Sequence, residues 1–417
     1  MGNLLYLVHR LPFPPNKGDK VRSYHLLKHL TARHRVFLGT FVDDPDDVAH
    51  IDTVRELCPD LHVVRLRPIM AKLRSLTGLL THQALGLRYY QNAGLQEWVK
   101  QTLAEKKIDA IVIFSSVMAQ YVEDIPGFIN PPMLVDFVDV DSAKWTQYGY
   151  NHRWPLSWLY QREGKQLLAY ERVVAARSRR SFFVTEHETA LFRKMAPECA
   201  HIVQAMSNGV DSDYFSPDPA RPSPFADVPS KLAQIPVVFT GAMDYWPNID
   251  AVSWFVSDVL PALHQMWPQI RFYIVGRSPP PAVQALASDV VVVTGTVTDV
   301  RPYLQYATVV VAPLRVARGI QNKILEAMAM DRPVVASQSC VDAIEAHTGV
   351  ELIAAMDAND FVREINALLK SPARAATVGQ SGRLRVVKSY SWANHLASID
   401  QYLDVKPPAQ VDAQETA

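Results

Sequence analysis

Residues 307–336 read ATVVVAPLRVARGIQNKILEAMAMDRPVVA, and this stretch decides the fold. The β-branched run at 308–311 predicts a buried parallel strand. After a loop over 313–319, apolar residues on one face predict a helix over 321–330. Arg332 and Pro333 end that helix, and the run at 334–336 starts another buried strand. The stretch therefore predicts a strand–loop–helix–strand unit of an open α/β sheet.

The loop inside this unit is a candidate anion site. Open α/β sheets bind ligands at the carboxyl ends of their strands. Here that position carries Arg315, Arg318 and Gly319, and it leads into a helix N-terminus whose free amides and dipole favour a phosphate. Lys323 lies near the start of the helix, and the Glu326 carboxylate one turn later can accept two hydrogen bonds from a ribose diol. The simpler interpretation is a surface helix with a Lys–Glu pair.

From Gly319 the sequence follows the pattern G-x-x-x-K-x-x-E-A-M-A and then P-V-V. This pattern resembles the donor-site signature of retaining glycosyltransferases of family 4, which have the GT-B fold. The segments YLVHRLPFPPNKGDKVRSYHLLKHL, VDFVDVDSAKW, SNGVDSDYF and FTGAMDYWPNIDAV resemble one subgroup, the sugar transferases of PEP-CTERM/exosortase exopolysaccharide systems. The resemblance covers nearly the whole chain. It implies an α/β protein with two Rossmann-like, doubly wound domains that face each other across a cleft.

The resemblance also implies roles for individual residues. Arg318 and Lys323 would stabilise the leaving diphosphate, and Glu326 would hold the ribose. The other expected donor-binding positions are glycines and residues of nearby turns and helix starts: Gly18, Gly241, Asn248, Gly295, Val297, Gly319, Ile320 and Gln321.

Three positions depart from the pattern of that family. Arg318 stands where the family usually has a glutamate that holds the transferred sugar, and Asp331 replaces the usual glycine after A-M-A. The donor-phosphate lysine that usually follows the glycine matching Gly241 is missing, and 246–248 occupy that region. Lys323 and Arg318 are the residues that can supply the charge instead.

The alternation of predicted strands and helices indicates parallel sheets throughout. We expect a first, acceptor-side domain over 1–206 and a second, donor-side domain over 237–388. Between them, 207–236 contains six prolines after residue 216 and is expected to be a linker. A helix over 389–404 would cross back to the first domain, and the polar tail 405–417 is expected to be disordered.

A second candidate site follows the first predicted strand, 3–9. The turn-rich loop 12–19 comes directly after it, at the carboxyl end of the strand. Gly18 permits close approach of a ligand to the backbone. Asp19 is either an acid in the first turn of a helix, worth about 1 kcal/mol, or a group that contacts a substrate. In related transferases this loop borders both acceptor and donor.

A third candidate lies at the end of a predicted strand over 133–140. Alternation would place the carboxylates of Asp139 and Asp141 on the same side while the strand lasts. A carboxylate there can assist the loss of a proton from an acceptor hydroxyl during glycosyl transfer. Alternatively, Asp141 caps a helix and Asp139 pairs with Lys144. The sequence leaves both interpretations open.

Composition excludes other classes of protein. The chain has 42 Lys+Arg and 42 Asp+Glu, so it lacks the basic excess of a dedicated nucleic-acid binder. Its three cysteines show neither disulfide nor zinc spacing, which favours a reducing compartment. Neither a signal-peptide pattern nor a run of about 18 apolar residues is present. A cytoplasmic protein is expected.

Residues 66–90 raise the question of a membrane. They are rich in Leu and Met and carry Arg67, Lys72, Arg74 and Arg88 without any acid. A basic amphipathic stretch can lie on an anionic leaflet. The alternative is a helical cover on the first domain with a solvated face. Peripheral contact with the inner membrane therefore stays open at this stage.

The expected activity is transfer of a sugar from a UDP- or GDP-linked donor to a glycan or lipid-linked glycan in exopolysaccharide biosynthesis. The resemblance implies retention of anomeric configuration, with no metal and no cofactor besides the nucleotide sugar. Two alternatives stay open: a nucleotide-sugar epimerase of the same fold, and a catalytically inactive nucleotide-sugar-binding protein, which Arg318 favours. An NAD-dependent oxidoreductase is not expected, because no G-x-G-x-x-G follows the first strand.

Overall fold

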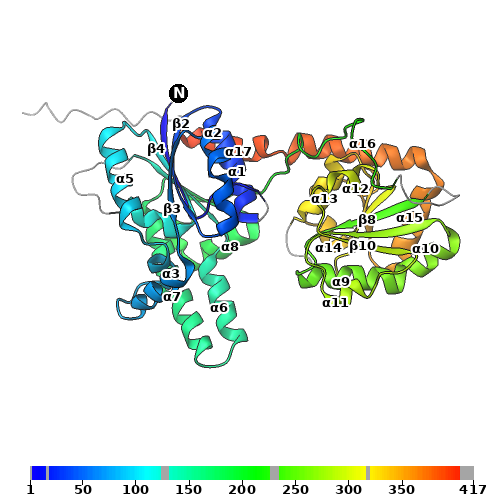
Figure 1. The fold of residues 1–417 in the computed structure, drawn as a ribbon, viewed down its shortest axis with the longest axis horizontal. Helices are drawn as coiled ribbons and strands as arrows, with labels where there is room; N and C mark the ends of the chain where they lie inside the picture. Colours follow the sequence, from blue (N-terminus) through cyan, green and yellow to red (C-terminus); the bar gives the residue numbers. More distant parts are fainter. Residues whose placement is uncertain (1, 16–17, 124–130, 226–233, 316–319, 404–417) are drawn as a thin grey trace, which may run out of the picture. The chain divides into compact units, whose positions relative to one another are not determined.

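The computed structural model describes residues 2–15, 18–123, 131–225, 234–315 and 320–403. The chain divides into two compact units (Figure 1). The first unit comprises Met1–Asn208 together with His395–Ala417, and the second comprises Gly209–Asn394. The second unit is thus inserted, along the chain, into the first. Among the described residues, no helix combines the length and the apolar character that crossing a bilayer requires.

The first unit is built on a parallel sheet of seven strands in the order β3-β2-β1-β4-β5-β6-β7. β1 is an interior strand that pairs with both β2 and β4, with Leu4 beside Val36 on one side and Ala110 on the other. This interior position explains the apolar run over residues 4–8. The strands are β1 (Asn3–Val8), β2 (Arg35–Val42), β3 (Asp60–Arg65), β4 (Ala110–Phe114), β5 (Met133–Val138), β6 (Arg180–Phe183) and β7 (Val203–Ala205).

Helices cover both faces of this sheet, as right-handed crossovers between parallel strands require. The order of its first strands is that of a doubly wound nucleotide-binding fold. The main helices are α1 (Gly18–Thr31), α2 (Ile51–Leu57), α3 (Pro68–Ser75), α4 (Leu85–Tyr89), α5 (Ala93–Glu105), α6 (Asp141–Asn151), α7 (Leu156–Arg177), α8 (Glu186–Met195) and α17 (Trp392–Leu403).

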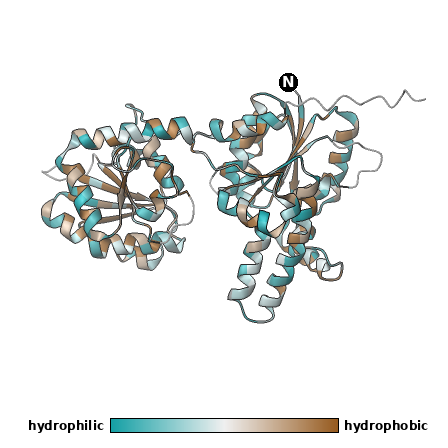
Figure 2. Cartoon of the chain, turned by 180° about the vertical axis from the view of Figure 1, so that it is seen from behind, coloured by the Kyte–Doolittle hydropathy of each residue, from teal (hydrophilic) through white to brown (hydrophobic). Residues whose placement is uncertain are grey.

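The second unit has a six-stranded sheet in the order β10-β9-β8-β11-β12-β13, and its described pairs are also parallel. Figure 2 shows hydrophobic strands inside each unit and more polar outward faces of the helices. The strands are β8 (Ile235–Thr240), β9 (Ile270–Val275), β10 (Val291–Gly295), β11 (Val309–Ala312), β12 (Val334–Ser337) and β13 (Ile353–Ala355). The helices are α9 (Trp246–Trp254), α10 (Leu260–Met266), α11 (Pro281–Gln284), α12 (Arg301–Gln305), α13 (Asn322–Ala329), α14 (Gln338–Val341), α15 (Ala358–Lys370) and α16 (Pro372–Ser389).

The prediction of an α/β protein with two parallel, doubly wound sheets is confirmed. The strand expected over 133–140 is shorter, because β5 ends at Val138 and α6 already begins at Asp141. Part of the expected linker packs on the second unit: Phe215 and Phe225 lie against its core, and Gln305 Nε2 donates to the Asp218 carbonyl at 2.7 Å. The expected tail lies outside the described residues.

The chain returns to the first unit in its last helix. Asp400 on α17 accepts a hydrogen bond from His29 Nε2, in the last turn of α1, at 2.7 Å. Asp400 also pairs with Arg33, two residues after that helix. Tyr402 Oη bonds Gln204 of β7 at 3.0 Å, and its ring lies 4.7 Å from the Arg180 guanidinium. Residues from the two ends of the chain thus build one face of this unit.

A buried ion pair fixes α1 against the sheet. Arg22 and Asp136 are both fully buried, and Arg22 Nε and Nη2 donate to the two carboxylate oxygens at 2.7 and 3.1 Å. Arg22 Nη1 also donates to Asn208 Oδ1 at 3.0 Å. Because a buried charge is tolerated only when paired and hydrogen-bonded, these residues depend on one another.

We expect Arg22→Met to destabilise the first unit by about 3–5 kcal/mol, since it leaves Asp136 as an unpaired buried charge. Scanning calorimetry of the full chain would measure the shift of the transition of this unit. The double variant Arg22→Met with Asp136→Leu should recover much of the loss. Arg35→Met, which breaks a pair whose arginine side chain is 58% exposed, should cost at most about 1 kcal/mol. Equal shifts for Arg22→Met and Arg35→Met would contradict this account.

Candidate active site

In the second unit, the carboxyl ends of β8 and β9 approach each other closely. A Cβ atom on Gly276 would lie 1.7 Å from the carbonyl oxygen of Gly241. A Cβ atom on Gly241 would lie 2.8 Å from Asn248 Nδ2 and 2.9 Å from Lys323 Nζ. Position 276 therefore requires glycine, because the clashing atom belongs to the backbone, whereas a side chain at Gly241 would displace the ends of Asn248 and Lys323. The side chains of Asn248 and Lys323 thus both lie close to the backbone at Gly241.

Lys323 is the cation at this point. Its Nζ donates to Asn248 Oδ1 at 2.5 Å and lies 4.3 Å from the centroid of the Phe239 ring. Asn248 is 5% exposed, and its Nδ2 donates to the carbonyl of Ala242 at 2.8 Å. Asn248 lies in the first turn of α9 and Lys323 in the first turn of α13. Two helix N-termini and one ammonium group thus meet, an arrangement that favours an anion.

Glu326 lies one turn after Lys323 on α13, and burial changes the pKa of both groups. Burial lowers the pKa of Lys323 to about 8, although the charge of Glu326 opposes the shift. Burial raises the pKa of Glu326 to about 7, although Lys323 opposes it. Burial therefore disfavours the charged form of both Lys323 and Glu326. A ligand can favour the charged forms by supplying an opposite charge or hydrogen bonds.

The loop after β11 was expected to bring Arg315 to this site, but Arg315 has another partner. Its Nε donates to Asp250 Oδ2 on α9 at 3.0 Å, its Nη2 pairs with Asp250 Oδ1, and its side chain is 52% exposed. The expectation for Arg315 was therefore wrong, because an acid on a neighbouring helix accepts its hydrogen bonds. Arg318 and Gly319 lie outside the described residues.

The remaining predicted donor-side residues lie at strand ends and turns of the same unit. Gly295 ends β10 with φ 69°, a left-handed conformation that favours glycine. Val297 and Ile320 pack against the core, and Gln321 precedes α13 as its N-cap. Asp331 has φ 63°, which explains why glycine is the usual residue there in the resembled family.

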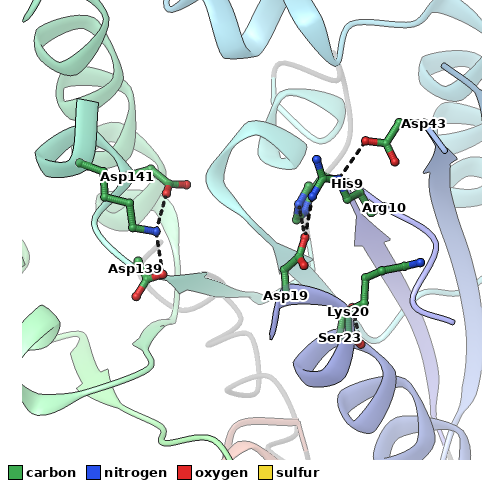
Figure 3. A network of polar contacts seen from close by, with 9 residues as sticks. His9, Arg10, Asp19, Lys20, Ser23, Asp43, Asp139 and Asp141 are labelled. Atoms are coloured by element: carbon green, nitrogen blue, oxygen red, sulfur yellow. Dashed lines mark hydrogen bonds and ion pairs between the residues drawn. The ribbon is translucent and has the colours of Figure 1, made fainter. Parts of the chain in front are cut away.

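In the first unit, a polar network surrounds Asp19 (Figure 3). Asp19 Oδ2 lies 3.4 Å from His9 Nε2 and accepts a hydrogen bond from Arg10 Nη1 at 3.1 Å. Arg10 Nε donates to Asp43 Oδ2 at 2.9 Å. Burial alone would raise the pKa of Asp19, but His9 and Arg10 outweigh it and lower that pKa well below its usual range. Asp19 is thus a fixed anion in the first turn of α1.

The network joins the carboxyl ends of three strands. His9 follows β1, Asp43 follows β2, and the His9 ring stacks on Phe114, the last residue of β4, at 5.8 Å between centroids. Sequence reasoning identified Asp19 but missed His9, Arg10 and Asp43. The sequence could have indicated these three residues by their position directly after predicted strands, because open sheets bind ligands there.

Asp139 lies in the turn between β5 and α6, and Asp141 is the first residue of α6 (Figure 3). Lys144 Nζ donates to Asp139 Oδ2 at 2.7 Å and to Asp141 Oδ1 at 3.2 Å. One lysine thus pairs with both carboxylates, as the second interpretation of the sequence had it for Asp139. Gly18 is exposed, and a Cβ atom there would meet nothing within 4 Å.

Backbone strain marks the same edge of the first sheet. Val138, the last residue of β5, has φ 69°, and Ser115, directly after β4, has φ 72°. A left-handed conformation is a genuine outlier for a β-branched residue such as valine. Such strain is concentrated at binding and catalytic sites, where the surrounding structure holds it in place. Among the described residues, His, Cys, Asp and Glu side chains form no group of three or more that could hold a metal ion.

The pKa values of the second unit predict a pH dependence of stability. Folded Glu326 titrates near pH 7 and the unfolded group near pH 4.5, so the folded state binds more protons between these values and stability falls as pH rises through that window. Relative to wild type, Glu326→Gln should therefore gain about 2 kcal/mol in free energy of unfolding between pH 4.5 and 7.5, measured by urea titration.

Glu351 provides a control of opposite sign. Burial would raise the pKa of Glu351, but the His347 amide and side chain and Arg385 outweigh it, so that pKa is lowered. Glu351→Gln should accordingly become less stable, relative to wild type, as pH rises. A Glu326→Gln profile parallel to that of wild type would refute the burial of Glu326.

Comparison with known proteins agrees with this geometry. Residues 234–371 match the family model described as Glycosyl transferases group 1. This range contains β8 to β13 and the residues from Gly241 to Asp331 described above. The prediction of a glycosyltransferase is confirmed at the level of this domain. No curated protein sequence matches the chain.

Solved structures share the fold over nearly the whole chain. Anabaena Alr3699/HepE, solved in complex with UDP, has a TM-score of 0.63 at 16% identity and covers 97% of this chain and 99% of its own. Sucrose-phosphate synthase from Thermosynechococcus elongatus has a TM-score of 0.63 at 18% identity, covering 96% and 98%. An S. aureus TarM mutant in complex with Fondaparinux, alpha-GlcNAc-glycerol and UDP has a TM-score of 0.59 at 13% identity, covering 97% and 100%. The chain thus has the two-unit α/β fold of GT-B glycosyltransferases, and its second unit carries a glycosyl transferases group 1 domain.

Proposed function

We propose that this protein transfers a sugar from a nucleotide-diphosphate donor to a glycan or lipid-linked glycan, with retention and without a metal ion. The observation that carries the proposal is the half-buried Lys323, whose Nζ lies between Asn248 and Phe239 at two helix N-termini. A family-4 activity in exopolysaccharide biosynthesis, in the cytoplasm, is part of the proposal. It rests on the sequence motifs.

In the proposed reaction, Lys323 and the first turn of α13 stabilise the diphosphate. Negative charge develops on the leaving diphosphate as the bond to the sugar breaks, so a fixed cation contributes most in the transition state. The partly neutral character of Lys323 in the free protein suits this role, because an incoming phosphate restores its full charge. Arg318 is proposed to assist from the loop before the helix.

Glu326 is proposed to bind the ribose of the donor. Burial raises the pKa of Glu326 to about 7. When ionised, its carboxylate can accept hydrogen bonds from two adjacent hydroxyls. Gly241 and Gly276 leave room for a phosphate to approach the backbone. We propose UDP as the nucleotide, because Anabaena Alr3699/HepE was solved with UDP and with UDP-glucose.

The first unit is proposed to bind the acceptor. Asp19 is a fixed anion in contact with His9, and such a pair can accept hydrogen bonds from an acceptor hydroxyl and orient it. Asp139 and Asp141 are proposed to contribute further along the same strand ends. Their pairing with Lys144 means that they would act as hydrogen-bond acceptors rather than as a free base.

The decisive experiment is calorimetric binding of UDP and GDP to the full chain, with and without Mg²⁺. We expect micromolar binding of UDP that does not depend on Mg²⁺. Lys323→Ala should weaken it by about 2 kcal/mol, roughly thirtyfold in Kd. Glu326→Ala should also weaken it, whereas Lys370→Ala, which removes an exposed lysine at the end of α15, should not.

Several outcomes would reject the proposal. Binding of neither nucleotide would remove the donor site, and wild-type affinity in Lys323→Ala would remove the diphosphate assignment. If UDP-sugar is isomerised without any acceptor, the protein is an epimerase of the same fold. If UDP-sugar binds but neither transfer nor isomerisation occurs, the protein is a binding protein.

Proton uptake provides an independent check on Lys323. Because burial holds the pKa of Lys323 at about 8, most of these side chains are neutral at pH 8.5. Binding of a diphosphate should raise that pKa and draw in roughly half a proton or more per molecule of UDP. Calorimetry in two buffers of different ionisation enthalpy would measure the uptake. Lys323→Arg, which stays charged at this pH, should bind with no uptake; equal uptake in both proteins would contradict the assignment.

A further inference from the structure

Large apolar side chains are exposed in two stretches of the first unit. In the α3 region, Ile69 is 76% exposed and Leu80 is 85% exposed, and at the tip of the α6–α7 hairpin Tyr150 is 77% and Trp154 is 81% exposed. We call the set of exposed apolar residues in these two stretches the apolar rim. It consists of Ile69, Met70, Leu73, Leu76, Leu80, Tyr148, Tyr150, Trp154, Leu156 and Trp158. An exposed group of this size marks an interaction site.

The hairpin explains why its aromatic residues point outward. Figure 1 shows α6 and α7 projecting together from the rest of the unit. Between them, a Cβ atom on Gly164 would lie 2.3 Å from Thr146 Oγ1, and a Cβ atom on Gly149 would lie 2.6 Å from Gln161 Cγ. The helices therefore pack on glycines at very short range. Tyr148 packs against Tyr160 across the hairpin, at 6.3 Å between ring centroids. Tyr150 and Trp154, nearer the tip, are left exposed.

The two stretches form one surface because α7 holds both. Arg162 Nη2 donates to the carbonyls of Gly78 at 2.7 Å and of Gln83 at 3.3 Å. The next residue, Glu163, accepts hydrogen bonds from the amides of Leu85 and Gly86 at 2.7 and 3.0 Å. The turn that carries Leu80 is thus fastened to α7 a few residues from Trp158.

The charge around the apolar rim has one sign. The sequence contains no Asp or Glu from 61 to 96, and none from 142 to 162. Arg65, Arg67 and Lys72 are exposed in the first stretch and Arg153 in the second. Lys144 is not counted here, because it pairs with Asp139 and Asp141. Arg74 does not belong to this set, since its guanidinium donates to the carbonyls of Arg88 and Tyr89 at 2.9 and 2.8 Å.

We propose that the apolar rim docks on the surface of an anionic lipid bilayer. Aliphatic side chains enter the acyl boundary, Trp and Tyr lie at the level of the headgroups, and the surrounding Lys and Arg meet anionic phosphates. A second copy of this chain fits the surface less well, because it would bring the same basic residues face to face. The proposal does not depend on the proposed donor site, since no residue of the rim belongs to the second unit.

Docking at the rim would leave the strand ends of the first unit near the bilayer. α6 has 11 residues and begins at Asp141, directly after β5. A helix of that length spans about 16 Å. Asp139, Asp141 and the strained Val138 would therefore lie about 16 Å above the docked tip, within reach of a saccharide that projects from a lipid headgroup. This last step rests on the proposed function.

The test is flotation of the full chain with vesicles of phosphatidylcholine alone and of phosphatidylcholine with phosphatidylglycerol at three to one. We expect binding to the anionic vesicles that is about tenfold or more above that to the neutral ones and that falls with added salt. Trp154→Ser with Trp158→Ser, and separately Leu73→Ser with Leu80→Ser, should each reduce it about tenfold. Leu384→Ser, which removes a 72% exposed leucine from α16, should leave it unchanged.

Fluorescence separates insertion from simple charge attraction. Brominated lipid should quench the tryptophan emission of the wild type, and Trp154→Phe with Trp158→Phe should keep binding but lose most of the quenching. Absence of binding to anionic vesicles, or equal binding by the serine variants, would overturn the proposal. So would a wild-type dimer that the serine variants abolish, because the rim would then be an interface between copies. Unchanged far-UV circular dichroism and an unchanged thermal transition in each variant would show that the fold of the first unit is intact.

Discussion

Both sheets of this protein are buried on both faces, and this burial decides where polar chemistry can lie. The interior strands are mostly apolar, so most ligand-binding groups lie beyond the strand termini. The His9–Asp19 network and the Lys323–Asn248 contact both lie at carboxyl ends of strands, one in each unit. Arg22 and Asp136 are charged residues inside the core of the first unit. The buried charge of Arg22 is tolerated only because Asp136 pairs with it.

The two candidate sites hold their charges differently. Asp19 lies between His9 and Arg10, whose contacts lower its pKa and keep it ionised. Lys323 and Glu326 are buried more deeply than their mutual attraction compensates, so both pKa values move towards neutrality. A site of the first kind keeps a constant charge, whereas a site of the second kind changes its charge when a ligand binds. The structure thus gives the first unit a fixed electrostatic frame and the second unit a responsive one.

The sequence predicted those features that depend on neighbours along the chain. The α/β class, most strands and the Lys323–Glu326 pair follow from local periodicity and from spacing within one helix. Features set by contacts between distant segments were not visible. Arg10 meets Asp43 only because β1 and β2 are adjacent, and Arg315 turns to Asp250 because α9 lies beside its loop. Val138 has a left-handed backbone conformation, which a β-branched side chain disfavours. No local sequence pattern could therefore indicate this conformation.

The order of the chain has a consequence for biosynthesis. Asp400, which binds His29 and Arg33, and Tyr402, which meets Gln204 and Arg180, lie after the whole of the second unit. During translation the sheet of the first unit emerges first. Asp400 and Tyr402, which bind this unit, emerge only after the whole of the second unit. A nascent chain released before His395 would therefore carry a complete second unit beside a first unit that still lacks its closing helix. The unit that begins synthesis first is the one that ends it last.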